Sequence, residues 1–554
     1  MSSVFHAKAR EMQGQMTVGS LATAQAQAFA DKPALLFPRR QLTYTFGELE
    51  HNAREVAAGL IALGVARGEH AALWAPNRPE YLSVVFGCAK AGVPLVLVNT
   101  NYQKFDLEQA LRQSDVTTLF IADGAARPGE YLDIIREICP ELAAGGLSGS
   151  AAARLPALRQ IIFLGDERQP GMLAWPEFLT LAAETTQDAV DAREKTVGPA
   201  DIFLIQHTSG TTGIPKGAMM THASYVLNMC AVIECQDLTA DDCICVPLPF
   251  FHIYGTIMVL AFLAAGAAVA PVERFQARAM LEAIESCRAT QVCGTPTMYV
   301  AALKELETRQ FDLSSLQGGT ISGAYCSPEL VKAVVEKMGA HSFGVIYGMT
   351  EALCTMSWPT DPLHRRSGTV GRIMPDRELK IVDPKTGETA PTDEVGELCV
   401  RGTPVIGGYY RMPEATAQVI DQEGWLHSGD LFRVDAEGYY SIVGRLKDLI
   451  IRGGENIYPT EIEGFLQTHP KVADAQVVGI PCDYFGEEVV AFVRLKSGCA
   501  ATSLELKRHC RQQIALDKVP AKVFFVEQYP LTASGKVQKF KLREMAVRLM
   551  ADAE

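Results

Sequence analysis

The stretch "DIFLIQHTSGTTGIPKG" (residues 201–217) joins an apolar segment to a loop of glycines and hydroxyl side chains. Its first seven residues predict a buried strand. In the loop, glycines let backbone N–H groups turn toward one point, while serine, threonine and lysine side chains add donors. The loop is therefore expected to bind a phosphate. The alternative is a Gly/Ser/Thr turn whose lysine is exposed to solvent. A nucleotide P-loop reads G-x-x-x-x-G-K-[ST], and this spacing fails after Gly210, which argues against a kinase or ordinary ATPase.

Short apolar strands alternate with helices on the amino-terminal side of this stretch. Thr45 and Glu48 form a capping box that starts a helix ending at Gly64. Strands are expected at residues 70–76, 93–98 and 116–122, and a helix at residues 79–91. This alternation predicts an α/β fold with parallel sheets covered by helices. Around residues 387–410, short segments broken by Gly, Pro, Thr and Asp predict a small section that is mostly antiparallel or barrel-like.

The composition is that of a globular enzyme, with 48% hydrophobic and 21% charged residues in a chain of 554. A formal charge of −13, without a basic run, argues against a nucleic-acid partner. Scattered cysteines without a CxxC pair indicate thiols of a reducing compartment. The N-terminus lacks an apolar secretion segment, and the longest apolar run, residues 257–272, is shorter than the ~20 residues that cross a bilayer. We expect a cytoplasmic protein without a transmembrane segment.

Five further motifs follow the loop in order: "YGMTE" (347–351), "HSGDL" (427–431), "GRLKD" (444–448), "RGGENIYP" (452–459) and "PLTASGKVQKFK" (530–541). With them, almost the whole chain resembles the adenylate-forming superfamily of acyl-CoA synthetases, luciferases and adenylation domains. It looks most like the medium-chain acyl-CoA synthetase branch. The resemblance implies a large AMP-binding domain over residues 1–444 and a small, mobile α+β domain over residues 445–554, with Lys447 at the hinge.

Such enzymes use ATP to convert a carboxylic acid to an acyl-adenylate, and then transfer the acyl group to coenzyme A. By resemblance, the loop grips the pyrophosphate moiety of ATP. Its residues are Thr208, Ser209, Gly210, Thr211, Thr212, Gly213, Ile214, Pro215 and Lys216. Tyr347 is expected to stack on adenine, Thr350 to reach a phosphate, and Glu351 to bind Mg²⁺ through a hard carboxylate oxygen. A solvated turn is the alternative role for Glu351.

The carboxyl-terminal motifs imply further roles. Asp430 is expected to accept hydrogen bonds from the ribose hydroxyls, with helix capping as the alternative, and Arg445 to add a donor near the ribose. Lys536 is expected to be the adenylation lysine, which meets both the incoming carboxylate and the α-phosphate. Glycines 453 and 454 are expected to let the pantetheine arm of coenzyme A pass closely.

The acid is expected to be an uncharged, small-molecule carboxylic acid, with a medium-chain fatty acid favoured. The segments that resemble the acyl pocket contain several methionines but no Lys or Arg, and they span residues 250–259, 294–301, 322–327 and 348–356. They include His252, Ala324 and Tyr325. Core packing is the equal alternative for His252, whereas His222 and His427 are taken as structural. Tyr325 and His207 depart from the family pattern, which leaves an aryl or alicyclic acid open.

Two other classes of protein remain as alternatives to an acyl-CoA synthetase. One is an acyl-adenylate ligase that loads a carrier protein, although the chain has no fused carrier domain. The other is a catalytically silent nucleotide-binding protein of the same fold, against which the intact Lys536, Glu351 and Asp430 argue. A homodimer is left open as the assembly.

Overall fold

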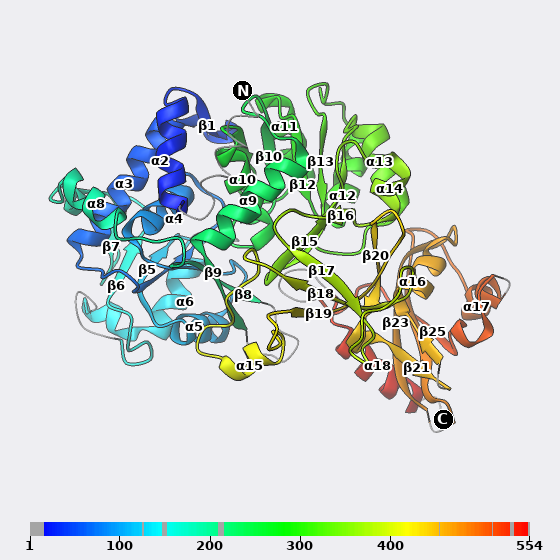
Figure 1. Ribbon diagram of the computed structural model, residues 1–554. Helices are drawn as coiled ribbons and strands as arrows, with labels where there is room; N and C mark the ends of the chain where they lie inside the picture. Colours follow the sequence, from blue (N-terminus) through cyan, green and yellow to red (C-terminus); the bar gives the residue numbers. More distant parts are fainter. Residues whose placement is uncertain are drawn as a thin grey trace. The chain divides into compact units, whose positions relative to one another are not determined.

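The computed structural model describes residues 16–124, 127–146, 152–208, 215–453, 455–482, 484–511, 513–531 and 537–551 (Figure 1). The chain divides into two compact units. Unit 1 comprises Met1–Glu378 and Val400–Leu426, and unit 2 comprises Leu379–Cys399 and His427–Glu554.

Unit 1 is built on two sheets whose strands are mainly parallel. The larger has the order β16 (Arg372–Ile373), β15 (Ala352–Met356), β14 (Gly344–Met349), β13 (Gly318–Ile321), β12 (Gln291–Gly294), β10 (Cys243–Val246), β11 (Ala268–Pro271), β1 (Pro33–Phe37) and β2 (Leu42–Thr45). The other has the order β7 (Leu173–Ala174), β6 (Gln160–Phe163), β5 (Val116–Ile121), β3 (His70–Trp74), β4 (Leu95–Leu97), β8 (Ile202–Thr208) and β9 (Lys216–Thr221). Antiparallel pairs occur at the edges, as in β8 with β9.

Helices α9 (His222–Gln236) and α10 (Ile253–Ala264) pack against each other between the two sheets (Figure 1). Helix α9 contacts β8 and β9, while α10 contacts β10 and β11. The adjoining helices α2 (Val18–Phe29), α3 (Phe46–Ala62) and α4 (Pro79–Ala91) contact one another. The remaining helices of unit 1 are α5 (Lys104–Gln113), α6 (Glu130–Ile138), α7 (Trp175–Ala182), α8 (Gln187–Glu194), α11 (Ala277–Cys287), α12 (Pro296–Leu306), α13 (Pro328–Met338), α14 (Leu363–Gly368) and α15 (Pro413–Ala417).

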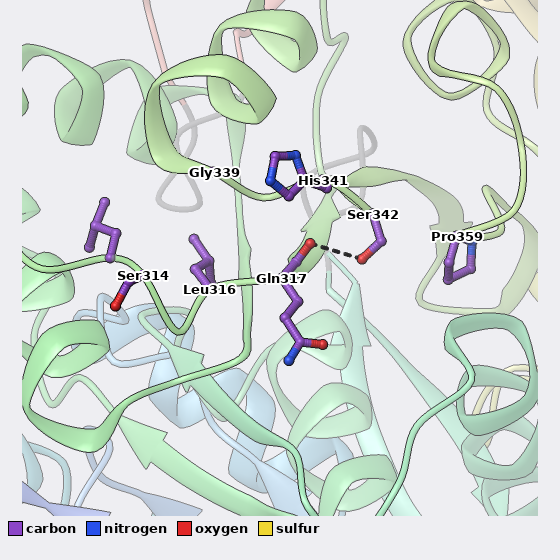
Figure 2. A pocket seen from close by; sticks show the side chains of 8 residues that line it. Ser314, Leu316, Gln317, Gly339, His341, Ser342 and Pro359 are labelled. Atoms are coloured by element: carbon purple, nitrogen blue, oxygen red, sulfur yellow. Dashed lines mark hydrogen bonds between the residues drawn. The ribbon is translucent and has the colours of Figure 1, made fainter.

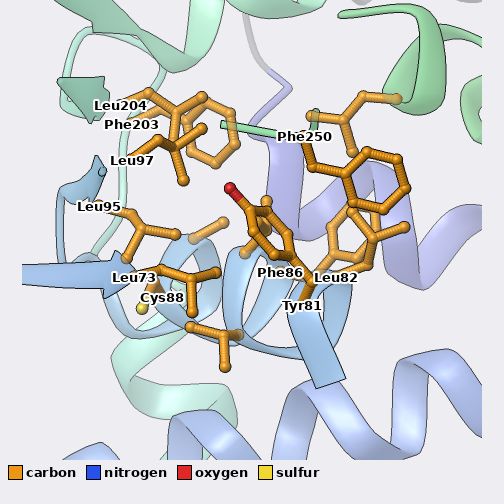
Figure 3. Packing of buried hydrophobic residues seen from close by; sticks show 14 of the residues in the cluster. Leu73, Tyr81, Leu82, Phe86, Cys88, Leu95, Leu97, Phe203, Leu204 and Phe250 are labelled. Atoms are coloured by element: carbon orange, nitrogen blue, oxygen red, sulfur yellow. The ribbon is translucent and has the colours of Figure 1, made fainter. Parts of the chain in front are cut away.

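Aromatic and aliphatic side chains fix strand β8 against its neighbours. Figure 3 shows Tyr81 of α4 among leucines of β3 and β4, with Phe203 of β8 and Phe250 close by. The rings of Tyr81 and Phe250 meet edge to face with centroids 5.4 Å apart. Because β8 ends at Thr208, this packing sets where the predicted phosphate loop begins.

Local patterns predicted these elements well. The capping box of Thr45 and Glu48 is present, and helix α4 has the predicted bounds. The apolar run at residues 257–272 forms the end of α10 and strand β11, both buried as expected. Among the described residues, no helix combines the length and apolarity needed to cross a membrane. The cysteines, all inside the described ranges, are present as thiols.

Unit 2 contains a sheet with both faces buried. Its order is β22 (Glu455–Ile457), β21 (Ile450–Arg452), β24 (Gly486–Leu495) and β23 (Val472–Cys482), with β25 (Lys522–Phe525) parallel to β24. Helices α16 (Pro459–Gln467) and α18 (Lys539–Ala551) contact β23, and α17 (Ser503–Arg511) contacts β25. Val489, Ala491 and Val493 enter one core, whereas Val490 and Phe492 enter another. Burial on both faces explains the continuous apolar sequence of β24.

The section expected around residues 387–410 contributes to a separate sheet, in which β19 (Leu426–Val434) and β20 (Tyr440–Arg445) pair antiparallel. Its strands follow the order β17 (Glu378–Val382), β18 (Gly396–Arg401), β19 and β20. Most of it belongs to unit 2, where Thr460 of α16 donates a hydrogen bond to the Val443 carbonyl of β20. Arg445 therefore lies inside a compact unit, and a mobile domain that starts there remains a prediction.

Candidate active site

Strands β8 and β9 form an antiparallel hairpin around the predicted phosphate loop. Thr208 at the end of β8 is paired with Lys216 at the start of β9. Beyond Lys216, the edge of β9 is covered by a later segment of unit 1, since Met219 N donates to the Gly408 carbonyl and Tyr410 N to the Gly217 carbonyl. This pairing brings Tyr409 to the hairpin.

Tyr409 connects Lys216 to Glu351. Its hydroxyl donates a hydrogen bond to Glu351 Oε1 at 2.6 Å, and the Lys216 ammonium lies 5.0 Å from the centroid of its ring. Burial raises the pKa of Tyr409 above its usual value, and the negative charge of Glu351 raises it further. The tyrosine therefore stays protonated and donates to the carboxylate throughout the neutral range. The sequence prediction missed Tyr409, for which the only local signal was the aromatic pair at residues 409–410.

Glu351 follows β14 in a short turn. Tyr347 and Met349 lie on the last part of this strand, and Thr350 and Glu351 connect it to β15. Tyr347 is buried, whereas Thr350 and Glu351 are half-buried. Because β14 pairs in parallel with β13, these residues lie at the carboxyl edge of the parallel strands, where open α/β sheets bind ligands.

An open depression lies at the opposite edge of the same sheet. Gln317 immediately precedes β13 and Ser342 lies just before β14, so both are at the amino ends of their strands. Figure 2 shows these residues with His341 and Pro359 around the depression, and the Ser342 hydroxyl donates to the Gln317 carbonyl at 3.1 Å. The depression is therefore separate from the predicted nucleotide residues of β14.

In unit 2, Asp430 and Arg445 form an ion pair. They face each other in the register of β19 and β20, with Arg445 Nε 3.1 Å from Asp430 Oδ1. Lys447 follows in a short 3₁₀ helix, Leu446–Asp448. Burial lowers the pKa of Lys447, and the nearby positive charge of Arg445 adds to the effect. Asp430, Arg445 and Lys447 thus form one charged cluster.

Glu397 on β18, which the sequence prediction also missed, holds the turn that precedes Asp430. Its Oε1 accepts a hydrogen bond from Gly429 N at 2.9 Å, while Oε2 lies 2.8 Å from His427 Nδ1. A glutamate in a short strand gives no local signal of such a contact.

Gly453 has a backbone conformation that favours glycine. Its φ is +61°, and its N–H donates to the Phe485 carbonyl at 2.8 Å. The guanidinium of Arg452 lies 4.1 Å from the centroid of the Phe485 ring. A side chain at residue 453 would therefore be strained.

His252 caps helix α10, because its Nδ1 accepts a hydrogen bond from Tyr254 N at 3.3 Å. This contact gives the residue a structural role, and a role beside the acid remains a prediction. Ala324 and Tyr325 lie in the exposed loop after β13. His207 Nε2 is 3.2 Å from the Ser114 hydroxyl, and burial lowers the pKa of His207 to about 4.

Several predicted residues lie outside the described ranges. They are Ser209, Gly210, Thr211, Thr212, Gly213, Ile214, Gly454 and Lys536. The structure thus brings Lys216 and Glu351 to one tyrosine in unit 1, and groups Asp430, Arg445 and Lys447 in unit 2.

Two family models match the chain. The AMP-binding enzyme model matches residues 22–410, and the model of the AMP-binding enzyme C-terminal domain matches residues 461–536. The chain belongs to the AMP-binding enzyme family. It is an adenylate-forming enzyme of the acyl-CoA synthetase type.

This AMP-binding enzyme is similar to several known proteins along nearly its whole length. It is 42% identical to "Putative acyl-CoA synthetase YngI" of Bacillus subtilis, with 96% of this chain and 97% of that protein covered. It is 38% identical to the mitochondrial medium-chain acyl-CoA ligase ACSF2 of Danio rerio, over 95% of this chain and 88% of that protein. The crystal structure of ATP-bound MatB from Rhodopseudomonas palustris has a TM-score of 0.82 at 28% identity, covering 96% of this chain and 99% of that one.

Proposed function

We propose that the enzyme activates an uncharged, medium-chain carboxylic acid with ATP and transfers the acyl group to coenzyme A, releasing AMP and pyrophosphate. The observation that carries the proposal is the contact of Tyr409 with both Lys216 and Glu351. It joins a cation at the end of the loop to a carboxylate at the sheet edge. The similarity to ACSF2, named a medium-chain acyl-CoA ligase, supports the class of acid.

The unit 1 residues fit a site for the phosphates of ATP. Glu351 offers the hard oxygen that Mg²⁺ prefers, and a bound Mg²⁺ would neutralise phosphate charge there. Tyr409 orients this carboxylate by donating to Oε1. Lys216 adds a positive charge beside the tyrosine ring, which favours binding of an anion.

The unit 2 residues fit a site for the ribose of the nucleotide. A carboxylate accepts hydrogen bonds from two adjacent hydroxyls, and Asp430 is the residue expected to do so. Arg445 orients that carboxylate through the contact at 3.1 Å. Lys536 is expected to stabilise the developing charge while the carboxylate of the acid attacks the α-phosphate.

The segments expected to line the acyl pocket favour an apolar tail. Met258 and Met356 are buried, Met298 and Met349 are half-buried, and none of these segments contains Lys or Arg. Methionine side chains adapt to flexible aliphatic chains, while a second carboxylate would be costly to bury without a cation.

A panel of acids tests the proposal. We expect AMP release to depend on coenzyme A and to be fastest with straight medium chains. A higher kcat/KM for benzoate or cyclohexanecarboxylate would favour the aryl or alicyclic alternative. A higher kcat/KM for succinate would contradict the uncharged tail. AMP release that never requires coenzyme A would favour a different acyl acceptor, and no AMP release with any acid would favour a silent protein.

Lys536→Ala tests the assigned chemistry directly. We expect ATP–pyrophosphate exchange to fall by a factor of about 10² to 10³, while supplied acyl-adenylate and coenzyme A still give thioester at a near-native rate. Lys541→Ala, which changes an exposed lysine of the same segment, is the matched control. Equal damage to both half-reactions in Lys536→Ala would contradict its role in adenylation.

A further inference from the structure

Three different donor side chains meet on the β18–β19 sheet of unit 2. They are Glu397 and Cys399 on β18 and His427 on β19, and one ligand atom from each lies within 4.8 Å of the other two. His427 Nδ1 is 2.8 Å from Glu397 Oε2 and 3.4 Å from Cys399 Sγ. Glu397 and Cys399 are two residues apart on a strand and so share a face, toward which the neighbouring strand presents His427.

The cluster is partly prepared for a cation. Cys399 is buried and the Glu397 side chain is 10% exposed, while the His427 side chain is 35% exposed and gives access from solvent. Glu397 Oε1 is already held by Gly429 N, which orients the carboxylate and leaves Oε2 facing the imidazole. Supporting hydrogen bonds of this kind position the ligands of metal sites.

The donor set selects the class of metal. A thiolate, an imidazole nitrogen and a carboxylate oxygen together match Zn²⁺, whereas Mg²⁺ prefers oxygen ligands alone. Zinc ligands lie about 2.0 to 2.3 Å from the ion, so a small outward shift of these atoms would admit one. The thiol of Cys399 would lose its proton on binding, and the ionised thiolate and carboxylate would balance the two positive charges of the ion.

We propose that Glu397, Cys399 and His427 form a binding site for Zn²⁺, with a fourth position open to water. The site does not include Glu351, the carboxylate expected to bind Mg²⁺, which belongs to unit 1. An ion held here would tie β18 to β19 three residues before Asp430. Bound zinc would therefore hold strand β19, which also carries Asp430, the residue expected to bind the ribose.

Zinc binding to the full-length enzyme tests the site. The chain contains 14 cysteines and 11 histidines, so the measurement is a difference between variants. After treatment with reductant and chelator, the protein is dialysed against Zn²⁺ and the bound metal is measured by mass spectrometry. We expect the unmodified chain to hold about one more zinc than Cys399→Ser or His427→Asn, and Glu397→Gln to weaken binding by about 10-fold or more.

Cobalt gives an independent spectroscopic test. Co²⁺ in place of Zn²⁺ should produce thiolate charge-transfer absorption in the near ultraviolet, which Cys399→Ser should abolish. Cys499→Ser is the matched control, because Cys499 is an exposed cysteine of the same unit outside the cluster. Glu397→Gln keeps the shape of the side chain and an acceptor for Gly429 N, so it tests the site even if another variant folds poorly. Equal zinc content in all variants, or cobalt absorption that survives in Cys399→Ser, would overturn the proposal.

Discussion

The hydroxyl of Tyr409 lies 2.6 Å from Glu351 Oε1. The ammonium of Lys216 lies over the ring of the same tyrosine, 5.0 Å from the ring centroid. One side chain thus orients the expected metal carboxylate and lies beside the cation at the end of the phosphate loop. The two contacts can be tested separately, because the hydroxyl donates to Glu351 whereas the ring contacts Lys216.

Tyr409→Phe removes the hydroxyl and keeps the ring. We expect a higher Mg²⁺ concentration for half-maximal ATP–pyrophosphate exchange, because loss of a hydrogen bond that supports a metal ligand costs about 10- to 100-fold in affinity or activity. The measurement is the initial rate against Mg²⁺ at saturating ATP. Tyr410→Phe is the control, since the Tyr410 hydroxyl donates to Asp115 instead. An unchanged Mg²⁺ dependence in Tyr409→Phe would mean that Glu351 is not the metal carboxylate.

Lys90→Met should destabilise unit 1. The Lys90 side chain is fully buried on α4, with Nζ 2.8 Å from Glu50 of α3 and 3.3 Å from Glu194 of α8. Burial already raises the pKa of Glu50, and Lys90 opposes that rise. Loss of the lysine leaves two mostly buried carboxylates without their cation, which costs about 3 to 5 kcal/mol. The urea midpoint of unfolding measures the effect.

Two further variants show whether charge is the cause. Lys104→Met breaks an exposed ion pair with Glu137 and should cost less than about 1 kcal/mol. Adding Glu50→Gln to Lys90→Met should recover part of the loss, because it removes one unpaired carboxylate. A double variant less stable than Lys90→Met would show that packing of the lysine stem matters more than its charge.

The sequence predicted what local patterns determine. Helix α4 was placed correctly because Pro79 favours its start and Gly92 its end, and β8 because a continuous apolar run is bounded by polar residues. The role of Tyr409 could not be predicted, since Glu351 lies 58 residues away and their contact depends on how the segment before α15 covers the edge of β9. The grouping of residues 379–399 with unit 2 likewise depends on strand pairing across distant segments.

We expect the stability of the fold to decrease as the pH is lowered from 6.5 to about 4, in part because His222 is buried in its neutral form. Its Nδ1 accepts a hydrogen bond from Val18 N at 3.1 Å, and burial lowers the pKa of His222 from 6.5 to about 4. Between these pH values, the imidazole of residue 222 is protonated in the unfolded chain but stays neutral in the folded chain. The free energy of unfolding therefore decreases as the pH is lowered. The loss is at most about 1.4 kcal/mol per pH unit for one such group.

His222→Asn separates this contribution from that of other groups. An asparagine oxygen can accept from Val18 N without titrating, so the urea midpoint should decrease less between pH 7 and pH 5 than in the unmodified chain. His51→Asn, at an exposed histidine of α3, is the control for loss of an imidazole. Parallel pH profiles for His222→Asn and the unmodified chain would contradict a buried neutral His222.

Lys447→Pro tests the predicted hinge. Lys447 is in the 3₁₀ helix Leu446–Asp448, whose end is marked by a hydrogen bond from Leu449 N to the Leu446 carbonyl. A proline at residue 447 fixes φ there and restricts Leu446, so it should hinder any rotation about this segment. If the two half-reactions need different orientations of residues 445–554, pyrophosphate release in a single turnover should persist while thioester formation is lost.

Lys447→Ala distinguishes backbone rotation from the charge of the side chain. This variant removes the ammonium next to Arg445 but leaves the backbone torsions unrestricted, so we expect it to form thioester at a rate close to that of the unmodified enzyme. Single-turnover assays of pyrophosphate and thioester measure both steps on the same samples. Equal loss of thioester in both variants would assign the effect to the lysine charge, and normal thioester synthesis by Lys447→Pro would place the hinge elsewhere in the chain.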